Sequence, residues 1–106
     1  MNEALLVMCN APDAASARAI AVSLVESRCA ACVNIGAPCE SIYWWEGKME
    51  AAFEVPLAIK TTAQRYTDVE AAILSLHPHQ VPEIIAVPVV AAMAQYLEWV
   101  RETTAR

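Results

Sequence analysis

The sequence predicts an α+β fold of element order β-α-β-β-α-β-α with an antiparallel sheet. The apolar residues switch repeatedly between the period of a strand and that of a helix, which sets this order. The stretch Ser41–Glu54 has the alternation and the central turn of a long hairpin. The chain has 106 residues, and we expect residues 1–106 to form one domain.

The first half of the chain predicts a strand, a helix and the start of a second strand. Ala4–Cys9 is a continuous apolar run, typical of a central strand covered on both faces, and Asn10–Pro12 interrupts it. Asp13 is a good N-cap for a helix whose apolar residues recur at helical spacing. Cys32–Ile35 then resumes strand structure, and we expect a bend or bulge at Gly36–Pro38.

The hairpin is predicted from two arms around a glycine turn. The arms are Cys39–Trp45 and a second strand from Lys48 to about Thr61, and Gly47 supplies the positive φ that a tight turn requires. Pro56 has no N–H to donate, so we expect a bulge or an unpaired edge there. Along the second arm the predicted inward face contains Ala51, Phe53, Val55, Leu57 and Ile59.

The second half predicts a helix, a strand and a final helix. Thr62 is expected to cap a helix that Pro78 stops, and Ile84–Val87 is expected to be another buried strand. Met93–Val100 has the spacing of a short amphipathic helix. Right-handed crossovers turn this order into the split βαβ, or ferredoxin-like, arrangement with helices on one face. In that arrangement the fourth strand lies antiparallel beside the first.

The composition predicts an oligomer. The chain is 58% hydrophobic and 18% charged, against about 45–50% and about 25% in ordinary domains. No apolar run approaches the ~18 residues of a membrane span, and no secretory signal pattern is present. We therefore expect a homo-oligomer assembled through the Ser41–Glu54 hairpin, without a membrane partner. Tyr43, Trp44 and Trp45 either anchor this interface or line a small-molecule pocket, and the two roles overlap if the pocket lies between subunits.

The charges and cysteines exclude several classes of function. A net charge of −5 with scattered Lys and Arg argues against nucleic acid as a partner. The four cysteines predict reduced thiols in the cytoplasm. Cys29 and Cys32 follow a predicted helix, whose negative end disfavours a thiolate, so they are expected to be packing residues rather than a redox pair.

No motif predicts an enzyme. The sequence has no nucleophile–base arrangement, no Gly-rich phosphate loop and no carboxylate pair at a catalytic spacing. Glu46, Glu50 and Glu54 form a row that is expected to be a solvated strand face. We therefore expect a non-enzyme with no catalytic and no cofactor-binding residue.

One corner of the predicted fold gathers candidate metal ligands. The topology brings the end of the first strand near the start of the fourth, and so gathers Cys9, Asp13, His77, His79 and Glu83. Thiolate and imidazole together suit copper or zinc. The metal ligands predicted here are Cys9, His77 and His79, for copper or another divalent cation. The alternatives are that Cys9 is a core residue, that His77 caps helix carbonyls and that His79 is an ordinary loop residue.

Several blocks of the sequence resemble the CutA, or divalent cation tolerance, family. The blocks, in the family's order, are Val7–Asp13, Ala30–Asn34, Ser41–Lys48, Lys60–Thr61, His77–Ile84 and Tyr96–Val100. The resemblance implies a ferredoxin-like fold in a tight homotrimer whose hairpins join neighbouring sheets. It also implies binding of copper or another divalent metal, a part in metal tolerance, and likeness to the PII signalling trimers.

The resemblance also implies site residues, with one departure. The family's proposed ligands fall on Cys9 and His77, whereas Leu76 stands where the family has the first histidine of a doublet. His79 stands where Tyr is common, and one hypothesis is that it supplies the missing ligand.

Three functions therefore remain open. The first is a trimeric metal-binding protein of metal tolerance. The second is a signalling trimer that binds a small anionic metabolite between subunits near Lys48 and Lys60. The third is a trimer with a structural role alone, in which metal binding is adventitious.

Overall fold

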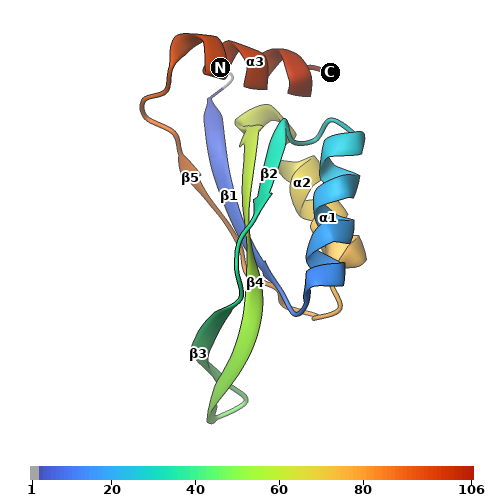
Figure 1. The fold of residues 1–106 in the computed structure, drawn as a ribbon, viewed down its shortest axis with the longest axis vertical. Helices are drawn as coiled ribbons and strands as arrows, with labels where there is room; N and C mark the ends of the chain where they lie inside the picture. The colour runs from blue at the N-terminus through green and yellow to red at the C-terminus, as the bar shows by residue number, and fades with distance from the viewer. Residues whose placement is uncertain (1–2) are drawn as a thin grey trace.

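The computed structural model describes residues 3–106, and its elements follow the predicted order (Figure 1). One difference is that the second predicted strand is divided in two. None of the helices in this part of the chain is long and apolar enough to cross a membrane. In chain order the elements are β1 (Ala4–Ala11), α1 (Ala14–Glu26), β2 (Cys32–Ile35), β3 (Cys39–Trp45), β4 (Lys48–Thr62), a 3-10 helix η1 (Ala63–Arg65), α2 (Tyr66–Leu76), β5 (Ile84–Pro88) and α3 (Ala94–Thr104).

The sheet has the split βαβ topology expected from the sequence. Its strand order is β2-β4-β1-β5, with every neighbouring pair antiparallel and β3 paired with β4 beyond the body of the sheet. The predicted position of the last strand beside the first is confirmed, because Cys9 is paired with Ile84. Helices α1 and α2 cover one face, and α3 lies at the end of the sheet away from the hairpin (Figure 1).

The hairpin of β3 and β4 projects from the body of the molecule (Figure 1). Its turn is formed by Glu46 and Gly47, whose φ angles of 50° and 79° are both positive, as a type I′ turn requires. Trp45 and Lys48 pair directly on either side of this turn. The glycine turn predicted from the sequence is confirmed.

A bulge separates β2 from β3. Ile35 pairs with Leu57 and Cys39 pairs with Glu54, so the first arm advances four residues while β4 advances three. The Gly36 N–H donates to the Pro56 carbonyl at 2.9 Å, within this irregular segment. The bend predicted at Gly36–Pro38 is confirmed. The irregularity expected at Pro56 lies on the strand opposite it, and β4 itself runs through without interruption.

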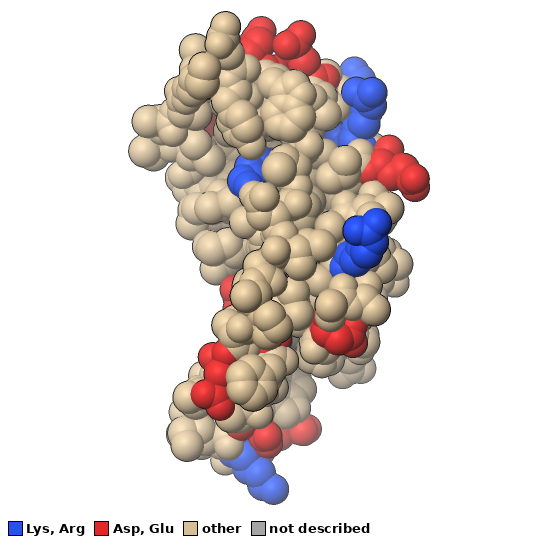
Figure 2. All heavy atoms as spheres, in the orientation of Figure 1, with Lys and Arg blue, Asp and Glu red and all other residues tan. Residues whose placement is uncertain are grey.

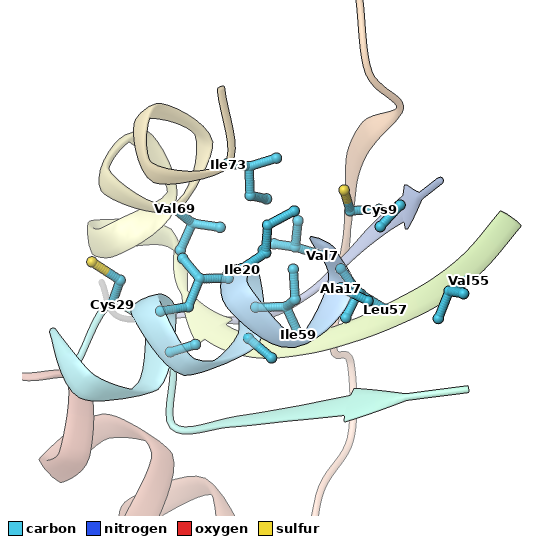
Figure 3. Packing of buried hydrophobic residues seen from close by; sticks show 14 residues of the cluster. Val7, Cys9, Ala17, Ile20, Cys29, Val55, Leu57, Ile59, Val69 and Ile73 are labelled. Atoms are coloured by element: carbon cyan, nitrogen blue, oxygen red, sulfur yellow. The ribbon is translucent and has the colours of Figure 1, made fainter. Parts of the chain in front are cut away.

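The core lies between the sheet and helices α1 and α2 (Figure 3). The inward face of β4 is buried from Val55 to Ile59, and β1 contributes Val7, Cys9 and Ala11. Helix α1 begins at the predicted cap, because the Asp13 carboxylate accepts a bond of 2.7 Å from the Ser16 N–H. That bond holds the pKa of Asp13 below its usual value.

Three local predictions are wrong. The strand β1 continues through Asn10 to Ala11, because both residues pair with β4. Thr62 makes no side-chain cap bond; it is a buried residue at the end of β4, and a 3-10 turn separates it from α2. Strand β5 was expected to be buried, but it is the edge of the sheet and is largely exposed. Its apolar side chains have no cover within the described part of this chain.

Candidate functional site

Asn10 joins the elements that meet at the corner predicted from the topology. Its backbone carbonyl lies 2.7 Å from Nε2 of His77, the residue that ends α2. Its side-chain amide donates to the Glu83 carboxylate at 3.3 Å, just before β5 begins. The end of β1, the end of α2 and the start of β5 are therefore held together through this one residue.

The hydrogen bonds of His77 define its tautomer. Nδ1 accepts from the His79 backbone N–H at 3.1 Å, so the ring proton lies on Nε2 and is donated to the Asn10 carbonyl. The side chain is 7% exposed. The predicted capping of helix carbonyls by this ring is not observed, although the His77 backbone N–H bonds to Ile73. Both ring nitrogens are engaged, so a cation can bind His77 only by displacing one of these partners.

Cys9 lies in the hydrophobic core, at the opposite end of the cluster from Cys29 (Figure 3). It is 1% exposed, and its Sγ lies 3.9 Å from the Asn10 carbonyl. Burial raises the pKa of the Cys9 thiol from 9.0 to about 11, with smaller contributions from the negative charges of Glu83 and Glu54. The thiol is therefore neutral at physiological pH, and the thiolate that a metal would require is disfavoured.

This raised pKa predicts a loss of stability at alkaline pH. Between pH 9 and 11 the unfolded chain loses the Cys9 proton while the folded chain retains it, so the free energy of unfolding falls as pH rises. The full loss is about 2–3 kcal/mol. Urea unfolding at pH 8, 10 and 11 measures it. Cys9→Ala should lose less stability over this range than the unsubstituted protein, and Cys39→Ala, which removes an exposed thiol, should lose as much. Equal losses in Cys9→Ala and the unsubstituted protein would contradict the assignment.

His79 is exposed and lies beside His77, with the two ring centroids 5.0 Å apart and the planes inclined by 55°. The structure thus brings together two of the three predicted ligands. Within residues 3–106, no group of three or more His, Cys, Asp or Glu side chains is arranged to hold a metal ion. In one copy of the chain the donors therefore fit a metal incompletely, since one is a protonated buried thiol and another an engaged imidazole.

A cleft of about 740 Å³ lies beside this corner, between the hairpin and the loop after α2. Sequence reasoning missed Asn10, Glu54 and Gln80 as parts of this site. Asn10 could have been found from the antiparallel pairing of Cys9 with Ile84. In that register the residue after Cys9, which is Asn10, lies opposite the residue before Ile84, which is Glu83. The cleft is lined by Asn10, Ser41–Tyr43, Trp45, Glu54, His77 and His79–Glu83.

The charges of the cleft do not suit an anion. Its lining includes two glutamates and two histidines but no lysine or arginine. Lys48, one of the two lysines expected near an anion site, lies at the hairpin turn. The other, Lys60, is hydrogen-bonded to Asn34 on β2. Neither of them lines the cleft.

Comparison with known proteins identifies the family of the chain. Residues 5–103 match the model of the CutA1 divalent ion tolerance protein family. The divalent-cation tolerance protein CutA of Thermus thermophilus is 41% identical over 104 residues, 98% of this chain and 99% of the relative. The crystal structure of CutA1 from Shewanella sp. SIB1 has a TM-score of 0.95 at 39% identity, covering 98% of this chain and 97% of that one. A structure from Archaeoglobus fulgidus, described as a periplasmic divalent cation tolerance protein CutA, has a TM-score of 0.92 at 36% identity, covering 95% and 98%. The chain belongs to the CutA1 divalent ion tolerance protein family.

Proposed function

We propose that this chain acts in tolerance of divalent cations by binding copper or another divalent ion reversibly, without chemical turnover. Membership of the family supports a role with divalent cations. The observation that carries the binding proposal is the pair of imidazoles of His77 and His79, 5.0 Å apart on a cleft that also contains Glu54 and Glu83. Imidazole is a good ligand for copper and zinc, and the glutamates give the cleft the sign of charge that attracts a cation.

The three proposed ligands differ in how readily each can bind. His79 is exposed, and its bond to His77 uses its backbone N–H rather than its ring, so it is the first ligand in this proposal. His77 becomes available when the cation replaces the His79 N–H at Nδ1. Cys9 contributes least, because its buried thiol must lose a proton against its raised pKa.

Copper titration by isothermal calorimetry tests this ranking. His79→Ala and His77→Ala should each weaken binding about tenfold or more, a loss of about 1.4 kcal/mol. Cys9→Ser should have a smaller effect, and Cys39→Ser, on the exposed hairpin, should have none. Affinity should fall as pH is lowered, because each ligand must lose its proton to bind. Unchanged affinity and stoichiometry in all three corner variants would end the proposal.

We also propose that the protein works as a homotrimer joined through the Ser41–Glu54 hairpin. The hairpin exposes large apolar side chains that a single copy leaves without cover: Trp44 is 74%, Met49 70% and Phe53 70% exposed. These three residues lie on one face of the hairpin, because Trp44 pairs directly with Met49 and strand residues alternate between faces. We call Trp44, Met49 and Phe53 the open face. Interfaces between subunits are enriched in aromatic residues and Met, as this face is.

The proposed compartment is the cytoplasm. All four cysteines are free, which fits a reducing environment. Fractionation of cells that express the tagged protein, read beside marker proteins of each compartment, tests this; recovery with a periplasmic marker would contradict it.

A further inference from the structure

The cleft is larger than a metal ion requires, and part of its lining is apolar. Its volume of about 740 Å³ lies within the range of about 300–1,000 Å³ typical of small-molecule sites. Tyr43 and Trp45 present aromatic rings from β3, and Val81 and Pro82 present apolar surface from the opposite loop. Both rings are partly exposed, so their faces remain accessible to a ligand. An apolar or aromatic body is the kind of group that these four side chains would contact.

The charged groups of the cleft are carboxylates. Glu54 comes from β4 and Glu83 from the loop just before β5, and the lining contains no lysine or arginine to neutralise them. The surrounding hairpin reinforces this charge, since residues 39–54 contain four glutamates and one lysine. Figure 2 shows acidic side chains gathered over the hairpin half of this face, with a basic side chain at its tip. The negative charges of Glu83 and Glu54 also act on the Cys9 thiol, and both raise its pKa.

We propose that this cleft binds an organic cation, a molecule with an ammonium group attached to an apolar or aromatic body. The ammonium lies near Glu54 and Glu83, and the body packs against Tyr43, Trp45 and the loop. A cation over the face of Trp or Tyr is attracted by the negative face of the ring, in addition to its attraction to carboxylates. The aromatic rings, and carboxylates that have no lysine or arginine beside them in the lining, together select such a ligand over a neutral molecule by charge attraction and over an anion by charge repulsion.

The cleft and the open face use opposite sides of the hairpin. Tyr43 and Trp45 alternate along β3 with Trp44, so they point away from the face proposed to meet another copy. A second copy seated on the open face would therefore lie on the other side of the hairpin from the two aromatic rings of the cleft. For this reason the ligand is expected to bind the assembled protein, and the experiment uses it in that form.

Three probes that share a phenyl ring test the selectivity: phenethyltrimethylammonium, the neutral 2-phenylethanol and the anionic 3-phenylpropionate. Binding is measured by calorimetry in the presence of EDTA, so that a bound metal contributes nothing and the outcome is independent of the copper titration. The cation should bind saturably, the neutral probe at least about tenfold more weakly, and the anion not at all. Equal affinities, or no saturable binding of the cation, would overturn the proposal.

Variants locate the site. The double variant Glu54→Gln/Glu83→Gln should weaken binding of the cation about tenfold and remove its advantage over the neutral probe. The matched control is Glu40→Gln/Glu50→Gln, two carboxylates on the same hairpin that do not line the cleft. Trp45→Leu should weaken binding of all probes that bind, because it removes an aromatic wall. An equal loss in the control pair would show that general surface charge, rather than the cleft, attracts the cation, and the proposal would fail.

Discussion

Replacing Trp44 and Phe53 together by Ser should convert the proposed trimer into folded monomers. Both side chains lie on the open face of the hairpin and are at least 70% exposed in one copy, so their loss removes contacts between copies rather than core packing. Interface anchors of this kind contribute about 2 kcal/mol or more each. Replacing both residues should therefore weaken the free energy of association by about 4 kcal/mol per chain, which lowers the association constant close to a thousandfold.

Sedimentation velocity over a dilution series from high to low micromolar protein measures this effect. The control is Leu74→Ser, which removes a half-exposed apolar side chain from α2 rather than from the hairpin. The control should keep the oligomeric state of the unsubstituted protein, and circular dichroism should show both proteins folded. A double variant that stays trimeric throughout the series would show that the hairpin does not hold the assembly together.

The two adjacent tryptophans have different expected roles. As a sequence, Trp44-Trp45 allows either an interface or a ligand pocket, and composition gives no means of choosing. In the structure each tryptophan lies on its own face: Trp45 lines the cleft, and Trp44 belongs to the open face. Trp45→Leu should therefore impair binding in the cleft without changing the oligomeric state. The interface role is thus a prediction for Trp44, and the ligand-binding role is a prediction for Trp45.

The element order could be predicted because each period of apolar residues matches a strand or a helix. The corner of Cys9, His77 and Glu83 followed from topology, since the fourth strand of this fold must lie beside the first. The hydrogen bonds of His77 could not be predicted. They depend on where the Asn10 carbonyl and the His79 N–H lie in three dimensions, and these positions make the ring an engaged donor and acceptor.

Strand β5 shows a second limit of sequence reasoning. Ile84–Val87 is as apolar as a strand buried in its own domain, yet Ile85 is 49% and Val87 40% exposed here. Apolar composition indicates that a surface is covered without indicating which chain covers it. The same reasoning applies to Phe53, which falls on the predicted inward face but is 70% exposed. It belongs to the hairpin, which projects beyond the part of the sheet that α1 and α2 cover (Figure 1).

The second large effect is expected at Ile59, in the part of β4 that pairs with both β1 and β2. This residue is fully buried, and its strand neighbours are Val7 on β1 and Val33 on β2. Ile59→Ala should lower the free energy of unfolding by about 2–5 kcal/mol, because it removes buried methyl groups and leaves a cavity. The control Leu74→Ala, on the exposed side of α2, should cost less than about 0.5 kcal/mol.

Protein concentration separates this loss from that of the hairpin variant. Assembly stabilises the folded chain by mass action, so a variant that weakens only the interface loses only the stability that assembly supplied. Once such a variant is monomeric, its melting temperature no longer depends on protein concentration. Ile59→Ala weakens the fold of each copy, so its melting temperature should fall at every concentration while still rising with concentration like that of the unsubstituted protein. Calorimetric scans of both variants at several concentrations measure the two behaviours. If Ile59→Ala instead lost its concentration dependence, the core around β4 and the hairpin that extends from it would not contribute separately to stability.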